Sequence, residues 1–189
     1  GLTGMGDRTT LGLFSTADWS EQHLIQASHE FRVGKEGLTL GLDGTYAWTK
    51  PDLPGLDPFS SETLVAGAWA RFPFLRSQTR NVSGTMGFEL IDQDTDFGAL
   101  PFSKDRLRVG YIRMQYDSID AASLRGASGY SMVEPRTAFS AVVEARKGFS
   151  VFGASQGCGA GFARCLLPGV VPPARFDADP TAFVLRAQA

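Results

Sequence analysis

The sequence has no long apolar run. No stretch of about 18 consecutive apolar residues, the minimum for a transmembrane helix, occurs among its 189 residues. Its first ten residues, GLTGMGDRTT, have neither the basic region nor the apolar stretch of a signal peptide. They also do not begin with Met, so we expect the chain to be a processed product or an internal piece of a longer protein.

An excess of basic charge is missing too. Lysine and arginine number 18 against 20 aspartates and glutamates, and charges of one sign form no block along the chain. Proteins that bind nucleic acids normally carry a basic face, so we expect no nucleic-acid partner.

Residues that could hold a metal are equally scarce. The only cysteines are Cys158 and Cys165, and the only histidines are His23 and His29. No histidine or third cysteine lies near the two cysteines, and the two histidines are six residues apart on one strand, too distant to share an ion, so we expect no metal. We also expect no cofactor.

Glycine (22 residues) and phenylalanine (14 residues) are abundant, a composition that favours strands joined by tight turns. The clearest strand is LTLGLDGTYAWTK (38–50). Its apolar side chains fall on one face, because side chains of a strand alternate between two faces, and its polar ones fall on the other. The apolar face carries Leu38, Leu40, Leu42, Gly44, Tyr46 and Trp48, and the other carries Thr39, Gly41, Asp43, Thr45, Ala47 and Thr49.

Similar alternation marks seven more segments: 8–18, 23–33, 63–74, 81–92, 106–116, 136–149 and 181–189. In 106–116 the apolar face begins with Leu107, Val109 and Tyr111 and loses its phase near Arg113, which suggests a bulge. We therefore predict an all-β fold, an antiparallel meander of about eight long strands that forms part of a transmembrane β-barrel.

The connections differ in length. Segments 34–37 and 74–80 are short and polar, whereas 51–62, 95–105 and 150–180 are long and rich in Gly, Pro and Asp. Segment 121–135 breaks this alternation of short and long connections.

Strands of about 9 to 11 residues cross a bilayer when tilted, and aromatic residues near strand ends resemble an interfacial girdle. These aromatics are Tyr46, Trp48, Phe72 and Phe74.

Charged residues in the middle of the strands are the candidate lining of a water-filled lumen. They are Glu30, Arg32, Asp43, Glu89, Arg108, Glu144 and Arg146. Opposite signs stand close together, as in Glu30 with Arg32 and Glu144 with Arg146, which suits weak, hydrated ion pairs across the lumen wall. The same alternation would also suit a soluble β-barrel or sandwich whose polar face meets solvent.

The chain resembles the haemolysin activator (ShlB/FhaC/HecB-like) family of outer-membrane transporters. The resemblance lies in Gly4-Met5-Gly6-Asp7 before a strand, in the Gly37-Leu38 strand start, and in three segments, FPFLRSQTRN (72–81), DRLRVGYIRM (105–114) and PPARFDADPTAFVLRA (172–187). It implies that residues 1–189 are a fragment of the C-terminal transmembrane barrel domain, without the POTRA domains and the remaining strands.

The family resemblance also implies a function. Such proteins translocate an unfolded secreted partner, a haemolysin or adhesin, in two-partner (type V) secretion. The implied partners are this exoprotein and the lipid bilayer of the bacterial outer membrane, and the implied protein is not an enzyme. Alternatives are a complete small outer-membrane barrel with a structural or adhesive role and a soluble β-barrel or sandwich binding protein.

Gly153-Ala154-Ser155-Gln156-Gly157 spells G-x-S-x-G, the motif of a hydrolase nucleophile elbow. Such hydrolases place their histidine after the serine, but His23 and His29 both precede Ser155. The Gly- and Pro-rich sequence that follows does not predict the helix of an elbow, so we expect a loop and no catalytic residue.

Cys158 and Cys165 enclose six residues. If the protein is exported, we expect them to form a small disulfide loop, because cysteines of exported proteins are commonly paired.

Overall fold

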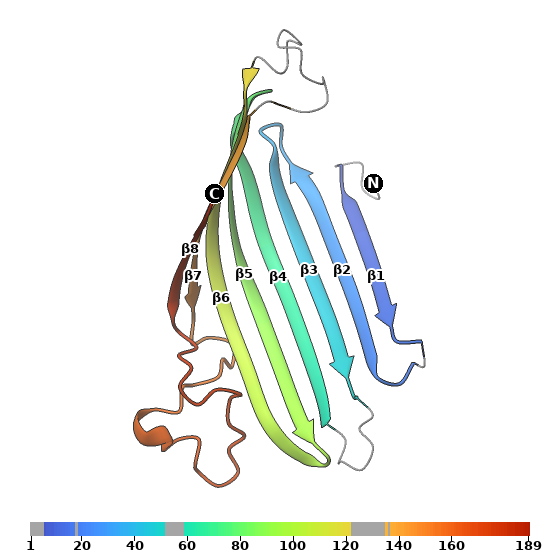
Figure 1. The fold of residues 1–189 in the computed structure, drawn as a ribbon, viewed down its shortest axis with the longest axis vertical. Coiled ribbons are helices and arrows are strands. Elements are labelled where there is room, and N and C mark those ends of the chain that lie inside the picture. The colour runs from blue at the N-terminus through green and yellow to red at the C-terminus, as the bar shows by residue number, and fades with distance from the viewer. Residues whose placement is uncertain (1–5, 18, 52–58, 122–134, 136) are drawn as a thin grey trace.

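The computed structural model describes residues 6–17, 19–51, 59–121, 135 and 137–189. They form one antiparallel sheet in which each strand pairs with the next along the chain, from β1 to β8 (Figure 1). The strands are β1 (Arg8–Ser15), β2 (Gln22–Val33), β3 (Leu38–Thr49), β4 (Phe59–Arg76), β5 (Arg80–Phe97), β6 (Leu100–Ile119), β7 (Ala138–Gly148) and β8 (Phe183–Gln188). The predicted all-β meander of eight strands is therefore confirmed.

The sheet is curved and open. Strands β1 to β4 face the viewer in Figure 1, whereas β7 and β8 are seen almost edge-on. Within the described residues β1 and β8 are the two edges, since neither pairs with the other. No helix in this part of the chain is long and apolar enough to cross a membrane.

The register gives the sheet two chemically different faces. Leu42 on β3 lies between His29 on β2 and Ala68 on β4, whereas Asp43 lies between Ser28 and Gly67. We name the face that carries Leu42 the apolar face and the face that carries Asp43 the polar face. The apolar face carries, among others, Leu11, Leu13, Ile25, Leu40, Tyr46, Trp48, Ala66, Ala70, Met86, Phe88, Ile112, Met114, Val143 and Leu185.

The connection between β5 and β6 corrects the sequence prediction. Segment 95–105 was expected to be a long loop, but Phe97 pairs directly with Leu100, so only two residues form the turn. Gly98 has a φ of 60° there, the backbone conformation that the first position of a tight hairpin needs and that glycine adopts without strain. Strands β4, β5 and β6 are consequently 18, 18 and 20 residues long, well beyond the predicted lengths.

The other predicted connections differ in outcome. Residues 34–37 form the expected short turn between β2 and β3, and β4 and β5 are joined by another short turn at Ser77, whose amide donates to the Arg80 carbonyl over 3.0 Å. The connections that contain 52–58 and 122–134 lie largely outside the described residues, as do Gly4 and Met5 of the family resemblance.

The predicted bulge near Arg113 is wrong. The register between β5 and β6 runs without a shift from Arg80 to Thr95, and that between β6 and β7 is also regular. Val109 pairs with Glu89 and Tyr111 with Gly87, which places both on the polar face together with Arg113. The apolar face of β6 instead carries Gly110, Ile112, Met114 and Tyr116, so the strand keeps one phase from Ser103 to Ser118.

The long connection 149–182 lies against the part of β6 that extends beyond β7. The Phe149 amide donates to the Arg108 carbonyl over 2.8 Å, and the Lys104 amide donates to the Pro172 carbonyl over 2.9 Å. The connection contains one short 3₁₀ turn, η1 (Ala160–Phe162). It thereby satisfies backbone groups that would otherwise form a free sheet edge.

The sheet has almost no interior. Among the described residues, Cys158 is the one buried hydrophobic side chain, at 1% exposure. Large side chains of the apolar face are instead exposed, such as Leu13 at 82%, Met86 at 60% and Leu42 at 57%. Sheets ordinarily bury their apolar face against a second layer, so this face needs a cover that the described residues do not supply.

Candidate functional site: the polar face of the sheet

A network of charged side chains occupies the polar face of β5, β6 and β7. Arg146 on β7 donates to Glu89 on β5 and also approaches Glu144, its neighbour along β7, at 3.4 Å. Glu144 is 5% exposed and accepts from Arg113 on β6 at 2.5 Å. Two carboxylates and two guanidinium groups thus alternate across three strands, so that each charge has a neighbour of opposite sign.

The ring of Tyr111 lies among these charges. The guanidinium carbons of Arg146 and Arg113 lie 5.5 and 5.9 Å from the ring centroid, within the range of cation–π attraction. The ring covers Gly87 on β5, where a Cβ atom would come within 2.6 Å of it. Glycine at this position therefore lets the ring lie flat on the backbone of the neighbouring strand.

The same arrangement recurs between β3 and β4. The ring of Trp69 covers Gly41, where a Cβ atom would lie only 2.2 Å from the ring. The guanidinium carbon of Arg71 lies 5.1 Å from the centroid of Trp69. Asp43 lies over Gly67 in a similar way, with its carboxylate 2.8 Å from the position of a Cβ. On the polar face, Trp69, Tyr111 and Asp43 therefore each lie over a glycine of a neighbouring strand.

The register brings six of the seven predicted lumen residues onto the polar face: Glu30, Arg32, Asp43, Glu89, Glu144 and Arg146. Three of them, Glu89, Glu144 and Arg146, meet in one network. Glu30 pairs instead with Arg8 on β1 at 3.3 Å.

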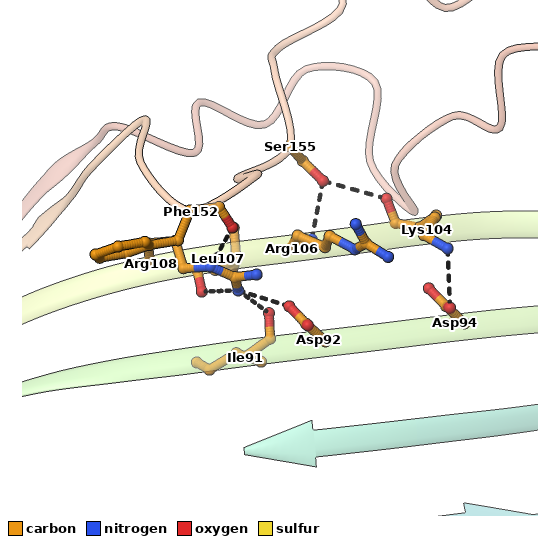
Figure 2. Close-up of polar contacts among 9 residues, drawn as sticks. All are labelled: Ile91, Asp92, Asp94, Lys104, Arg106, Leu107, Arg108, Phe152 and Ser155. Carbon is orange, nitrogen blue, oxygen red and sulfur yellow. Dashed lines mark hydrogen bonds and ion pairs between the residues drawn. The ribbon is translucent and has the colours of Figure 1, made fainter. Parts of the chain in front are cut away.

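Arg108 does not share this face. It pairs with Leu90 on β5, so the phase error along β6 placed it on the wrong side of the sheet. Its guanidinium donates to Asp92 over 2.5 Å and to the Phe152 carbonyl over 3.2 Å (Figure 2). Arg108 is 5% exposed and ties the connection 149–182 to the sheet.

Sequence reasoning missed Arg113, Tyr111 and Arg71 as members of the polar face. The rings of Trp69 and Tyr111 each lie over a glycine, Gly41 and Gly87, within an otherwise polar alternation. The pairing of Arg113 with Glu144 joins residues 31 positions apart. It depends on the register between β6 and β7, which the local sequence does not determine.

Among the described residues, the hydrogen bonds of the Ser155 hydroxyl and amide are all to backbone atoms. Its hydroxyl accepts from the Arg106 amide over 2.8 Å and donates to the Lys104 carbonyl over 3.3 Å (Figure 2). Its own amide donates to the Arg106 carbonyl over 2.8 Å. The G-x-S-x-G segment thus fastens the connection 149–182 to β6.

Cys158 and Cys165 are joined by a disulfide within this connection.

The two histidines lie on the apolar face. His23 lies between the rings of Trp19 and Trp48, at centroid distances of 5.7 and 4.7 Å, and Nδ1 of His29 is 2.9 Å from the Thr9 hydroxyl. The described residues contain no group of three or more side chains able to hold a metal.

Aromatic rings gather at both ends of the apolar face. His23, Tyr46 and Trp48 form a contiguous group where β2 begins and β3 ends, with Trp19 beside them. Phe72 and Phe74 pack edge to face at the other end, and Tyr116 contacts Phe139 there. The aliphatic side chains of the apolar face lie between these two aromatic groups.

The apolar face also has a hollow of about 860 Å³ above β3 to β6. Its lining includes Leu42, Ala68, Met86, Ile112 and Phe149. Phe149 comes from the connection that follows β7, and its ring lies over Gly110. The hollow therefore combines sheet residues with a segment of the long connection.

No known protein family, curated protein sequence or solved structure matches this chain.

Proposed function

We propose that this chain forms part of the wall of a transmembrane β-barrel in a bacterial outer membrane. The observation that carries the proposal is the contrast between the two faces of a single sheet layer. The apolar face exposes aliphatic side chains, and the polar face holds paired charges. Hydrocarbon can cover the first, and a water-filled lumen can hydrate the second.

The dimensions of the apolar face support a bilayer as its cover. On β4, Phe72 lies ten positions after Glu62, which pairs with Trp48. These ten steps span roughly 33 Å along the strand, or about 25 Å in height at a tilt of about 40°. This matches the apolar band of outer-membrane barrels, which is about 25 Å tall and is flanked by aromatic girdles.

The charges that β5 and β6 place on the apolar face lie at one end of it. Asp92, Arg106 and Arg108 belong to the parts of β5 and β6 that lie near the connection 149–182. Arg108 and Asp92 form an ion pair, and so do Lys104 and Asp94, at 3.1 Å. The ion pairs neutralise these charges, and Arg108 is 5% exposed and hydrogen-bonded to Phe152 of the connection.

Within such a barrel, the function we propose is translocation of an unfolded exoprotein, of the haemolysin or adhesin type, by two-partner secretion. The resemblance to haemolysin activators favours this function over other barrel functions. A lumen wall of mutually paired charges and hydroxyl groups offers few apolar contacts on which an unfolded chain would be retained. The proposal assigns the chain no enzymatic activity and no cofactor.

The hollow of the apolar face favours a second candidate, a soluble β-barrel or sandwich that binds an apolar ligand. Its volume of about 860 Å³ is within the range of small-molecule sites, and its lining is apolar. In that case the apolar face would turn inward and the polar face would meet solvent.

Dependence on detergent separates the two candidates, and cysteine labelling in native membranes tests the assignment of the two faces. Cys158 and Cys165 are already paired, so a cysteine introduced at position 42 or 43 is the reactive thiol. In a barrel, Leu42→Cys faces hydrocarbon and resists a water-soluble maleimide, whereas Asp43→Cys reacts from the lumen. Purification without detergent, together with a protected Cys at position 42, would overturn the membrane assignment.

The secretion function has its own test. Cells that lack the protein should fail to release a large exoprotein that cells complemented with it do release, as measured by mass spectrometry of the medium. An unchanged set of released proteins, from cells in which labelling shows the barrel in the membrane, would contradict secretion and leave the barrel intact.

A further inference from the structure

The polar face holds a second group of charges, away from the network of Glu89 and Arg146. Four arginines from β1, β2 and β4 form it, and we name them the arginine cluster: Arg8, Arg32, Arg71 and Arg76. They line two adjoining hollows of about 310 and 250 Å³. Arg32, Arg71 and Thr39 belong to both hollows, so the two form one continuous feature.

The arginine cluster and the two carboxylates beside it carry a net positive charge. Glu30 is an acidic member of the lining and pairs with Arg8 at 3.3 Å. In the described part of the chain, Arg32, Arg71 and Arg76 have no acidic partner. Asp7, the residue before Arg8, is buried and takes part in an interaction. Even with both carboxylates counted against four arginines, two positive charges remain in excess.

Arg71 is held in place at the centre of the cluster. Its guanidinium carbon lies 5.1 Å from the centroid of Trp69, and its Nε donates to the Thr85 hydroxyl over 3.4 Å. Gly37 borders Arg76, and a Cβ atom there would lie 3.4 Å from the Arg76 guanidinium and 3.1 Å from Pro73. Arg71 lines both hollows, and Arg76 lines the second of them.

The cluster is elongated along the strands. Glu30 pairs with Arg8, Arg32 lies two residues further along β2, and Arg76 lies five residues beyond Arg71 on β4. These offsets add up to roughly 20 Å at the rise of a strand. A compact anion would meet only part of such a row, whereas an extended peptide of about six residues would meet all of it.

We propose that the arginine cluster binds an extended acidic segment of a polypeptide, whose carboxylates accept charge-assisted hydrogen bonds from Arg32, Arg71 and Arg76. Arginine presents a planar fork of donors that matches a carboxylate. The biological source of the segment rests on the proposed function, since an exoprotein inside the lumen would supply it. The binding itself depends only on the geometry of the polar face.

Fluorescence anisotropy with a labelled hexaglutamate peptide tests the proposal. The full chain is used, in detergent or in buffer, at low salt because exposed charges are screened by ions. Hexaglutamate should bind at least tenfold more tightly than hexaglutamine. Arg32→Gln and Arg76→Gln should each weaken binding several-fold, and the double variant should weaken it tenfold or more.

Arg175→Gln is the matched control, because it removes the same charge from an exposed position in the connection 149–182. Equal weakening by Arg175→Gln, or equal binding of hexaglutamine, would overturn the proposal. Competition by inorganic phosphate at the concentration that hexaglutamate requires would show a site for simple anions and would overturn the assignment to a peptide. Arg76→Gln leaves the Trp69 stack untouched, so it remains informative if variants at Arg71 unfold.

The outcome is independent of the secretion test. Loss of peptide binding in a chain that labels as a membrane barrel would refute this inference alone. Peptide binding by a chain that purifies without detergent would refute the membrane assignment and retain the acidic-peptide site.

Discussion

Arg146 on β7 reaches across β6 to donate a hydrogen bond to Glu89 on β5. Both side chains are about one fifth exposed, and the Arg146 guanidinium also lies over Tyr111. We expect Arg146→Gln to destabilise the sheet more than Glu89→Gln, because it leaves both Glu89 and Glu144 with one cation fewer. In a double-mutant cycle the coupling between Arg146 and Glu89 should be about 1 kcal/mol, measured by chemical unfolding.

The exposed pair of Arg175 and Asp177 provides the comparison for this cycle. Its side chains are 77% and 68% exposed, so its coupling should be close to zero. Equal coupling free energies for the two pairs would show that the Arg146–Glu89 pair contributes no more stability than an ordinary surface ion pair.

Gly41 and Gly44 lie on the same strand and provide a second prediction. A Cβ atom at position 41 would lie 2.2 Å from the Trp69 ring, whereas at position 44 the nearest atom is 3.9 Å away. Gly41→Ala should displace Trp69 and destabilise the protein by about 1 to 3 kcal/mol. Gly44→Ala should be neutral or slightly stabilising, because alanine restricts the unfolded chain.

Tryptophan fluorescence identifies the cause. Gly41→Ala should alter the emission of Trp69, and Gly44→Ala should leave it unchanged. If both alanines behave alike in stability and emission, Trp69 does not lie on Gly41.

The alternation of side chains predicted all eight strands, because one face of each strand is apolar and the other polar. It failed where that rule is ambiguous. Tyr111 and Val109 look apolar but lie on the polar face, and Arg108 looks polar but lies on the apolar face, held by Asp92 and Phe152. The contacts that hold Arg108 come from 16 and 44 residues away, so no local pattern encodes them.

The hairpin at Phe97 and Leu100 was hidden for a different reason. Its sequence contains the Gly, Pro and Asp that mark long loops, yet Gly98 and Ala99 make the turn and the other residues continue the strands. Pro101 opposes Asp96 at a shift in the register, a position where the missing amide of proline is tolerated. The polar network was likewise beyond local reasoning, because it depends on the register of several strands at once.

The disulfide gives a third prediction, for the connection 149–182. Replacing Cys158 and Cys165 together by serine removes a constraint worth about 2 to 3 kcal/mol of chain entropy for so short a loop. The sheet should persist, while trypsin should cleave after Arg164, inside the opened loop. Hydrogen exchange at the Lys104 amide, which donates to Pro172, should also become faster. Global unfolding of the double serine variant would show that the disulfide supports the sheet itself.

Asp179 gives the fourth prediction, a response to pH. The side-chain hydroxyl and the amide of Thr181 donate to its carboxylate over 2.7 and 2.8 Å, and these bonds lower the pKa of Asp179 below its ordinary value. Because the folded state favours the charged form, its contribution is present above the unfolded pKa and is lost as pH falls through the lowered folded pKa. The turn that leads into β8 should therefore loosen only in strong acid.

Protection of the Thr181 amide from hydrogen exchange measures this effect. The protection factor should fall on acidification in the parent chain. In Asp179→Asn it should be lower at neutral pH and independent of acid, since the amide side chain does not titrate. An acid response that persists in Asp179→Asn would assign it to another carboxylate.

The fifth prediction compares Leu42 and Asp43, which are adjacent on β3 and lie on opposite faces. Leu42 is 57% exposed on the apolar face, and Asp43 lies over Gly67 on the polar face. If hydrocarbon covers the apolar face, Leu42→Arg places a charge in it near the middle of the span, at a cost of roughly 2 to 4 kcal/mol. Asp43→Arg adds a cation to a hydrated wall and costs much less. We therefore expect Leu42→Arg to reduce the amount of protein in outer-membrane fractions sharply, and Asp43→Arg to leave that amount near the parental level.

Leu42→Ala is the control for lost apolar area, because it removes the side chain without adding charge, and it should assemble. A chain in which Leu42→Arg assembles normally would have its apolar face in water or in a polar interface, and the membrane proposal would fail with it.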